Sequence, residues 1–151
     1  MDGHVLATQA LFAAAKAEFR QLSFFYFHNC LYEEVWTDNA RRLTQRIPTW
    51  DILRRYGPDY RAIFVGDAAM SPYEISHPGG SVEHFNEESG AVWMHRVANT
   101  YPATVWLNPT PEQHWTYSQS TKIIKDLVND RMYPLTLEGL DDAMRELTRK
   151  H

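Results

Sequence analysis

The chain has 151 residues, 44% of them hydrophobic and 23% charged, values typical of one globular domain with a proper core. Its formal net charge of −4, with scattered Lys and Arg, lacks the basic stripe of a nucleic-acid-binding protein. No apolar run approaches the roughly 20 residues of a membrane span, and a single cysteine, Cys30, excludes an internal disulfide.

The amino terminus lacks the basic start and the cleavage site of a signal peptide, so we expect a cytoplasmic protein. We expect a single domain over residues 1–151, because neither a linker nor a repeat divides the chain. An Ala-rich run with apolar residues at heptad spacing predicts a helix over Leu6–Ala17. Leu22–His28 and Leu31–Trp36 are strand candidates that follow each other closely, which favours antiparallel pairing.

A polar loop is predicted over Thr37–Arg46, followed by a short helix that ends before Gly57. Thr49 stands where the N-cap of this helix should lie, just after Pro48. Asp51 falls in its first turn, where the helix dipole favours a negative charge. N-capping alone explains Thr49, but a hydroxyl at a helix start is also a candidate metal ligand.

The stretch around which the chain is organised is an apolar run, Arg61–Gly66, that ends at Asp67. A short apolar run between turn signals predicts a strand buried on both faces, as in a parallel sheet. Asp67 would then lie at the carboxyl end of a strand, where open α/β sheets place their ligand sites. The alternative is that Asp67 only caps the next turn, through the backbone N–H of Ala69 or Met70.

The rest of the chain alternates helices and strands. We expect a helical turn, a helix, a strand, a helix and a strand over Ser71–Ile75, Val82–Asn99, Thr104–Leu107, Ile123–Val128 and Met132–Leu135. A final helix begins after the N-cap Thr136, with an apolar stripe at Leu137, Leu140, Met144 and Leu147. This order predicts an α/β fold with three layers, a mostly parallel sheet flanked by helices. Such sheets normally open with a strand, whereas this chain opens on a helix.

Several stretches together resemble a von Willebrand factor type A (vWA) domain, which is a Rossmann-like fold. They are Leu22–Trp36, Ile47–Leu53, Tyr60–Glu74, Val105–Pro109 and Tyr133–Leu140. The chain is most similar to the bacterial vWA proteins related to carbon-monoxide-dehydrogenase accessory proteins. Proteins of that subset are often encoded beside MoxR-type AAA+ ATPases.

The resemblance implies a metal-ion-dependent adhesion site, in which three loops at the carboxyl edge of the sheet hold a divalent cation, commonly Mg²⁺. By position, Thr49 matches the Thr of the second loop and Asp67 matches the Asp of the third. The Asp-x-Gly-x-Ser motif of the first loop, and the strand before it, have no counterpart, because Met1–His4 resembles the segment just after that motif. The resemblance therefore implies a partial site that would bind Mg²⁺ weakly.

An absent first strand would leave Leu22–His28 and Arg61–Gly66 without their shared neighbour. Unpaired strand edges favour association. We therefore expect that the chain closes the gap directly, forms a homodimer through the exposed edges, or is marginally stable.

The leading hypothesis is a vWA-like, non-enzymatic protein-protein interaction module, and the resemblance implies a partner such as a MoxR-type AAA+ ATPase. The alternative is a small metal-dependent, hydrolase-like α/β enzyme that uses Asp67 and nearby histidines. That enzyme would need a deep pocket with a His or second carboxylate within reach of Asp67. His77, His84 and His95 are dispersed and do not have the spacing of a zinc motif.

Two further features have a functional and a structural interpretation. Cys30 could act as a thiol nucleophile, but nothing in its sequence surroundings activates it, which favours a small buried residue. Trp50, Tyr73 and Trp115 fall near predicted loops or helix starts. Exposed together they would form an aromatic patch for a protein partner, and ordinary packing is the alternative.

Overall fold

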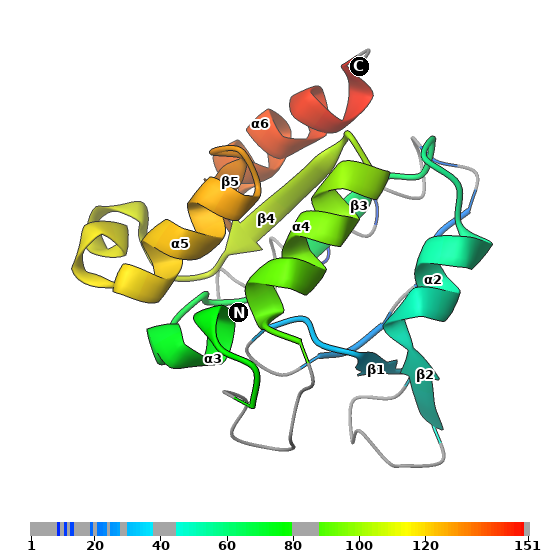
Figure 1. Cartoon of the computed structure of the whole chain (residues 1–151). Coiled ribbons are helices and arrows are strands. Elements are labelled where there is room, and N and C mark those ends of the chain that lie inside the picture. Colours follow the sequence, from blue (N-terminus) through cyan, green and yellow to red (C-terminus); the bar gives the residue numbers. More distant parts are fainter. Residues whose placement is uncertain are drawn as a thin grey trace.

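Three parallel strands form the sheet around which the fold is arranged in the computed structural model (Figure 1). The structure describes Gln9, Leu11, Ala13, Phe19 and the ranges 21–23, 25–27, 30–37, 45–79 and 88–149. The elements in chain order are β1 (Glu34–Trp36), β2 (Arg46–Pro48), α2 (Thr49–Arg55), β3 (Ala62–Val65), α3 (Pro72–Ser76), α4 (Gly90–Thr100), β4 (Thr104–Asn108), the 3-10 helix η2 (Glu112–Tyr117), α5 (Gln119–Leu127), β5 (Met132–Pro134) and α6 (Leu137–Thr148).

The strand order β3-β4-β5 places β4 in the centre, with parallel pairing on both sides. All five residues of β4 are buried, as its continuous apolar run predicts. Alternate side chains of a strand point to opposite faces. Trp106 belongs to one hydrophobic cluster with residues of α4 and α5, whereas Val105 and Leu107 pack in a second cluster with α6.

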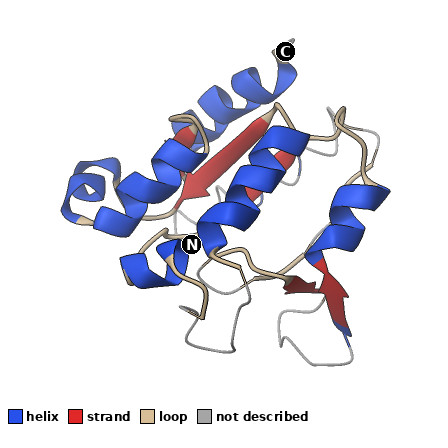
Figure 2. Cartoon of the chain, in the orientation of Figure 1, coloured by secondary structure: helices blue, strands red, loops and turns tan. Residues whose placement is uncertain are grey.

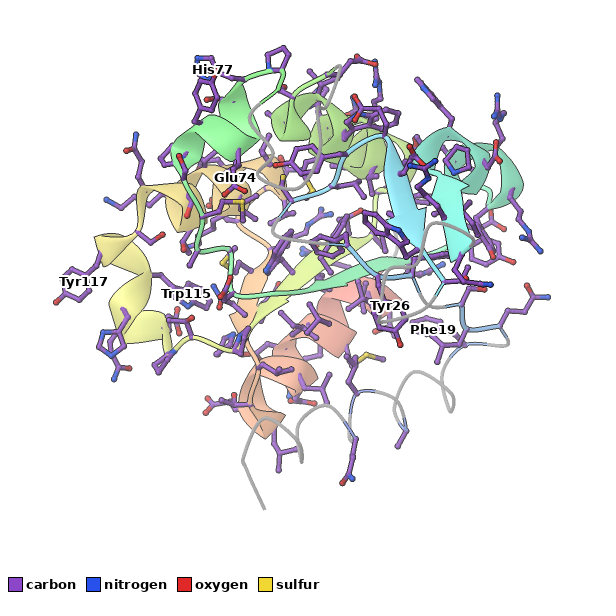
Figure 3. All side chains as sticks on the ribbon, turned by 90° about the horizontal axis from the view of Figure 1, so that it is seen from below. Phe19, Tyr26, Glu74, His77, Trp115 and Tyr117 are labelled. Carbon is purple, nitrogen blue, oxygen red and sulfur yellow. The ribbon has the colours of Figure 1, made fainter. Side chains whose placement is uncertain are left out.

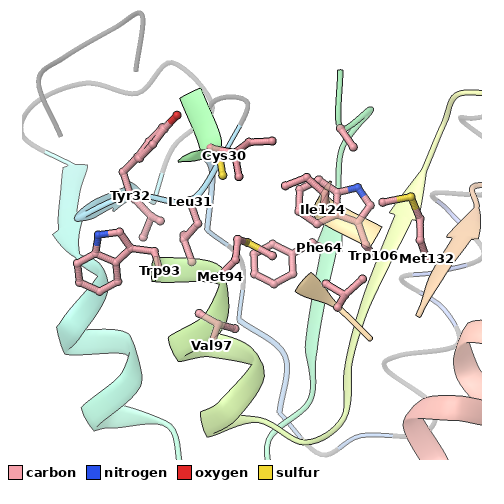
Figure 4. Packing of buried hydrophobic residues seen from close by; sticks show 14 of the residues in the cluster. Cys30, Leu31, Tyr32, Phe64, Trp93, Met94, Val97, Trp106, Ile124 and Met132 are labelled. Carbon is pink, nitrogen blue, oxygen red and sulfur yellow. The ribbon is translucent and has the colours of Figure 1, made fainter. Parts of the chain in front are cut away.

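Helices therefore cover both faces of the sheet. Figures 1 and 2 show α4 and α5 on one face and α6 on the other. The structure confirms the predicted α/β architecture, a parallel sheet flanked by helices, but it does not test the resemblance to a vWA domain. Figure 4 shows the larger cluster, in which Phe64, Trp106 and Met132 of the three strands meet Met94 and Val97 of α4 and Ile124 of α5.

The prediction that β3 is buried on both faces is wrong. Only Phe64 of its four residues is buried, and Val65 is 42% exposed. In the part of the chain that the structure describes, β3 pairs with β4 alone and so lies at an edge of the sheet. An apolar run shows that a strand is hydrophobic. The exposure of that strand depends on which strands and helices lie beside it, and these cannot be read from the run itself.

The first strands also differ from expectation. The strand predicted over Leu31–Trp36 is shortened to β1. It pairs with β2, which was not predicted and which joins the end of the predicted loop to the start of the predicted helix. Leu22–His28 contributes one antiparallel bridge, Tyr26 to Trp36, with N–H···O distances of 2.7 and 2.9 Å. Phe24 and His28 lie outside the described residues, as does most of the predicted helix Leu6–Ala17.

Helix starts agree better with the sequence. The Thr136 hydroxyl accepts a hydrogen bond from the Gly139 N–H at 3.0 Å and caps α6 as predicted. Leu140 and Leu147 are buried, but Leu137, the first residue of α6, is 63% exposed. The predicted helix over Val82–Asn99 is observed as α4, capped by the Ser89 hydroxyl, and residues 80–87 lie outside the described ranges.

Ser71 starts α3 through a capping box with Glu74, and β5 agrees with the strand predicted over Met132–Leu135. In the described ranges, every helix is too short or too polar to cross a membrane.

Candidate functional site

Asp67 directly follows β3 at the carboxyl edge of the sheet, as predicted, and it is exposed. Its Oδ1 accepts a hydrogen bond from the Ala69 N–H at 3.0 Å. The turn-capping role proposed for Asp67 is therefore confirmed. Its Oδ2 makes no hydrogen bond with any residue that the structure describes, so one carboxylate oxygen remains available for a ligand or partner.

The loop after Asp67 is fixed by the first turn of α5. The Ala68 carbonyl accepts hydrogen bonds from the Ser120 hydroxyl at 2.6 Å and the Thr121 hydroxyl at 3.2 Å. Ser120 Oγ also accepts from the Met70 N–H at 3.0 Å. Ala68 is buried and has a φ of 57°, a left-handed conformation that is unusual for a residue other than glycine.

The strand end before Asp67 is held in a similar way. The Trp106 Nε1–H donates to the Gly66 carbonyl at 2.8 Å, across from β4 to β3. Sequence reasoning missed Ser120, Thr121 and Trp106 as supports of this loop. The one available signal was the pair of small hydroxyl residues at a helix start, and it does not indicate which distant carbonyl they bind.

Thr49 lies at the start of α2 but is not its N-cap. Pro48 is the N-cap and Thr49 the first helical residue, so the capping prediction is wrong by one position. The Thr49 N–H donates to the Glu33 carbonyl at 2.7 Å, and its hydroxyl donates to the Tyr32 carbonyl at 2.6 Å. Thr49 is buried. Its two hydrogen bonds join the start of α2 to Tyr32 and Glu33, the residues just before β1.

These two residues do not fit a magnesium site as the structure places them. Thr49 is engaged with a buried carbonyl, while Asp67 is exposed on a different element and caps its own turn. Within the described ranges, no three His, Cys, Asp or Glu side chains gather where they could hold a metal ion. Mg²⁺ binding at Thr49 and Asp67 stays a prediction.

The described residues around Asp67 do not form an acid–base pair with it. In the described part of the chain, no histidine or second carboxylate hydrogen bonds to Asp67. His77 stacks on Tyr73 with ring centroids 4.3 Å apart, and its Nδ1 lies 2.6 Å from the Ser76 hydroxyl. His95 is exposed on α4, and His84 lies outside the described residues. No observation here favours the enzyme alternative.

Cys30 is a packing residue. It is 1% exposed, and a Cβ added to Gly90 at the start of α4 would clash with its Sγ. Burial raises the pKa of the Cys30 thiol from 9.0 to about 12. A neutral, enclosed thiol is a poor nucleophile, which agrees with the structural interpretation of Cys30.

We expect Cys30 to resist alkylation in the folded protein. At pH 8 a thiol with a pKa of about 12 is ionised roughly 1,000-fold less than one with a pKa of 9.0, and burial slows the reaction further. The measurement is the rate of iodoacetamide labelling in buffer and in 8 M urea, followed by mass spectrometry. Equal rates in the two solutions would contradict the burial of this thiol.

The raised pKa also predicts a pH dependence of stability. Folding favours the protonated form of the Cys30 thiol. The contribution of this thiol to the free energy of unfolding is therefore fully present below pH 9 and is lost as the pH rises toward 12.

The three residues considered for an aromatic patch differ in their exposure. Trp50 and Tyr73 are exposed, but Trp115 is buried and donates its Nε1–H to the Thr110 carbonyl at 2.8 Å. One face of Trp50 is occupied, since the Arg96 guanidinium lies 4.7 Å from its ring centroid. Tyr117 on η2, which the sequence did not single out, is 83% exposed and projects from the molecule (Figure 3).

Comparison of this chain with protein-family models, with curated proteins and with solved structures finds no match. The vWA resemblance therefore stays a prediction that rests on the sequence stretches themselves.

Proposed function

We propose that this chain is a vWA-like protein-binding module whose contact surface is the carboxyl edge of the parallel sheet around Asp67. The observation that carries the proposal is an exposed carboxylate on a fixed loop. Asp67 follows β3, and the next residue, Ala68, is held by Ser120 and Thr121. A charge held in one geometry can be recognised by a partner without first being ordered.

A partner that offers an Arg or Lys side chain would make a charge-assisted hydrogen bond to Asp67 Oδ2. By the family resemblance, a MoxR-type AAA+ ATPase is the partner that we propose first.

Replacing Asp67 with alanine is expected to weaken binding to a MoxR-type AAA+ ATPase at least about tenfold. The expected loss reflects removal of the one carboxylate that the proposal places in the contact. The measurement is biolayer interferometry with both purified proteins. Asp142→Ala is the matched control, because Asp142 is also exposed but lies on α6, against the sheet's other face.

A loss of affinity in Asp67→Ala with unchanged affinity in Asp142→Ala supports the proposal. Equal affinities of both variants and the wild type would overturn the placement of the contact, and no binding by the wild type would overturn the proposed partner. Calorimetric titration of the chain with Mg²⁺ tests the metal separately. Equal heats from the wild type and Asp67→Ala would exclude a metal role for Asp67.

A further inference from the structure

A groove of about 410 Å³ lies between β2 and α2, away from the Asp67 edge. Its apolar wall is formed by Phe25, Ile47, Pro48, Ile52 and Tyr56. The wall is held together from within, since the rings of Phe25 and Tyr56 meet edge to face at 6.2 Å. The hydroxyl of Tyr101, which follows α4, shares its one hydrogen between the Tyr56 carbonyl at 3.0 Å and the Ile52 carbonyl at 3.3 Å.

The ring contact and the Tyr101 hydrogen bonds fix the positions of Ile52 and Tyr56 in the wall. The groove is therefore preformed. It is open to solvent and has room for one large side chain.

Charged side chains line the rim unevenly. Arg46 forms an ion pair with Glu34, and Asp51 pairs with Arg54 at 2.5 Å. The guanidinium of Arg55 lies 5.7 Å from the Tyr56 ring centroid. In the part of the chain that the structure describes, Arg55 has no carboxylate partner. Among the described residues, the rim thus carries one uncompensated positive charge, although the whole chain has a net charge of −4.

We propose that this groove binds a short segment of a partner protein in which a large apolar residue stands beside an Asp or Glu. The apolar side chain would fill the space over Ile47 and Ile52. The adjacent carboxylate would reach Arg55, whose planar guanidinium suits carboxylate recognition. This inference rests on the proposed function as a protein-binding module, and it places a second contact on that module.

The charge balance selects this occupant over others. A basic segment would meet Arg55 unfavourably, and a purely apolar one would leave it unpaired beside the contact. Since the groove is open and Arg55 is exposed, we expect a weak contact in isolation that adds to a larger interface.

Isoleucine methyl groups give a direct reading of the groove, because Ile47 and Ile52 line it while Ile75 and Ile124 are buried elsewhere. The experiment uses the full chain with ¹³C-labelled isoleucine methyls. It is titrated with two pools of capped pentapeptides, Gly-Φ-Glu-Glu-Gly and Gly-Φ-Lys-Lys-Gly, where Φ is Leu, Phe or Trp. We expect saturable shifts of Ile47 and Ile52 with the Glu pool, at an affinity at least about threefold tighter than with the Lys pool.

Arg55→Glu is expected to abolish or reverse the preference for the Glu pool. Lys122→Glu is the matched control, because it makes the same change of charge on an exposed residue of α5, which does not line the groove. Retained preference in Arg55→Glu, equal shifts with both pools, or no shift of Ile47 and Ile52 would each overturn the inference. None of these outcomes bears on the Asp67 contact, whose failure is read from binding of the ATPase.

Discussion

Replacing Gly139 with alanine is expected to destabilise the protein by about 3 kcal/mol or more, although alanine normally stabilises a helix by up to about 1 kcal/mol relative to glycine. Gly139 lies in the first turn of α6, pressed against the end of β5. A Cβ at this position would clash with the Pro134 carbonyl oxygen and lie 2.9 Å from both the carbonyl carbon and Cγ of Pro134. Backbone atoms cannot move aside as a flexible side chain can.

Relief of the clash would push α6 from the sheet, together with Leu140 and Leu147 of the second cluster. The measurement is the midpoint of urea unfolding, monitored by circular dichroism. Gly57→Ala is the matched control, because its nearest non-neighbouring atom, Asp59 Oδ1, would be 3.6 Å from the new Cβ. We expect Gly57→Ala to change the midpoint little. Equal midpoints for Gly139→Ala and the wild type would show that α6 is not held as closely as described.

Replacing Trp106 with alanine is expected to cost about 3–5 kcal/mol of unfolding free energy. Trp106 is fully buried in the central strand, where its ring stacks on Phe64 at 5.2 Å and meets Phe27 edge to face at 6.0 Å. The substitution opens a cavity between the sheet and helices α4 and α5. It also removes the hydrogen bond to the Gly66 carbonyl, just before Asp67.

Trp106→Phe separates these two effects, because phenylalanine retains an aromatic ring against Phe64 but cannot donate to Gly66. We expect it to cost about 1–3 kcal/mol, chiefly through the carbonyl left without its partner. Urea unfolding of both variants and the wild type measures the difference. A cost for Trp106→Phe as large as for Trp106→Ala would show that the hydrogen bond, rather than packing, dominates at this position.

The elements that the sequence predicts well are those whose signals are local. The apolar run of β4 and the Thr136 cap of α6 each lie within a few residues, and the structure agrees with both. The exposure of β3 could not be predicted in the same way, because it depends on which strands pair. β2 was missed because it has only three residues and ends in a proline directly before a helix start.

The candidate site shows the same limit. The sequence located Asp67 at the strand end, and its bond to Ala69 spans only two residues. The support of Ala68 by Ser120 joins positions 52 residues apart, which no local pattern encodes. Thr49 was placed at a helix start, but its hydroxyl binds Tyr32, 17 residues earlier, rather than its own helix.

The left-handed backbone of Ala68 has a thermodynamic consequence for recognition. For a residue other than glycine, this conformation costs about 1 kcal/mol or more. Without its hydrogen bonds to α5, the loop would therefore spend much of its time in other backbone conformations. Two hydroxyl groups of α5 hold Ala68 in the left-handed conformation, and the cost is met once, when the chain folds. Any partner that binds Asp67 then loses little loop entropy on association, and its dissociation rate reports the contact itself.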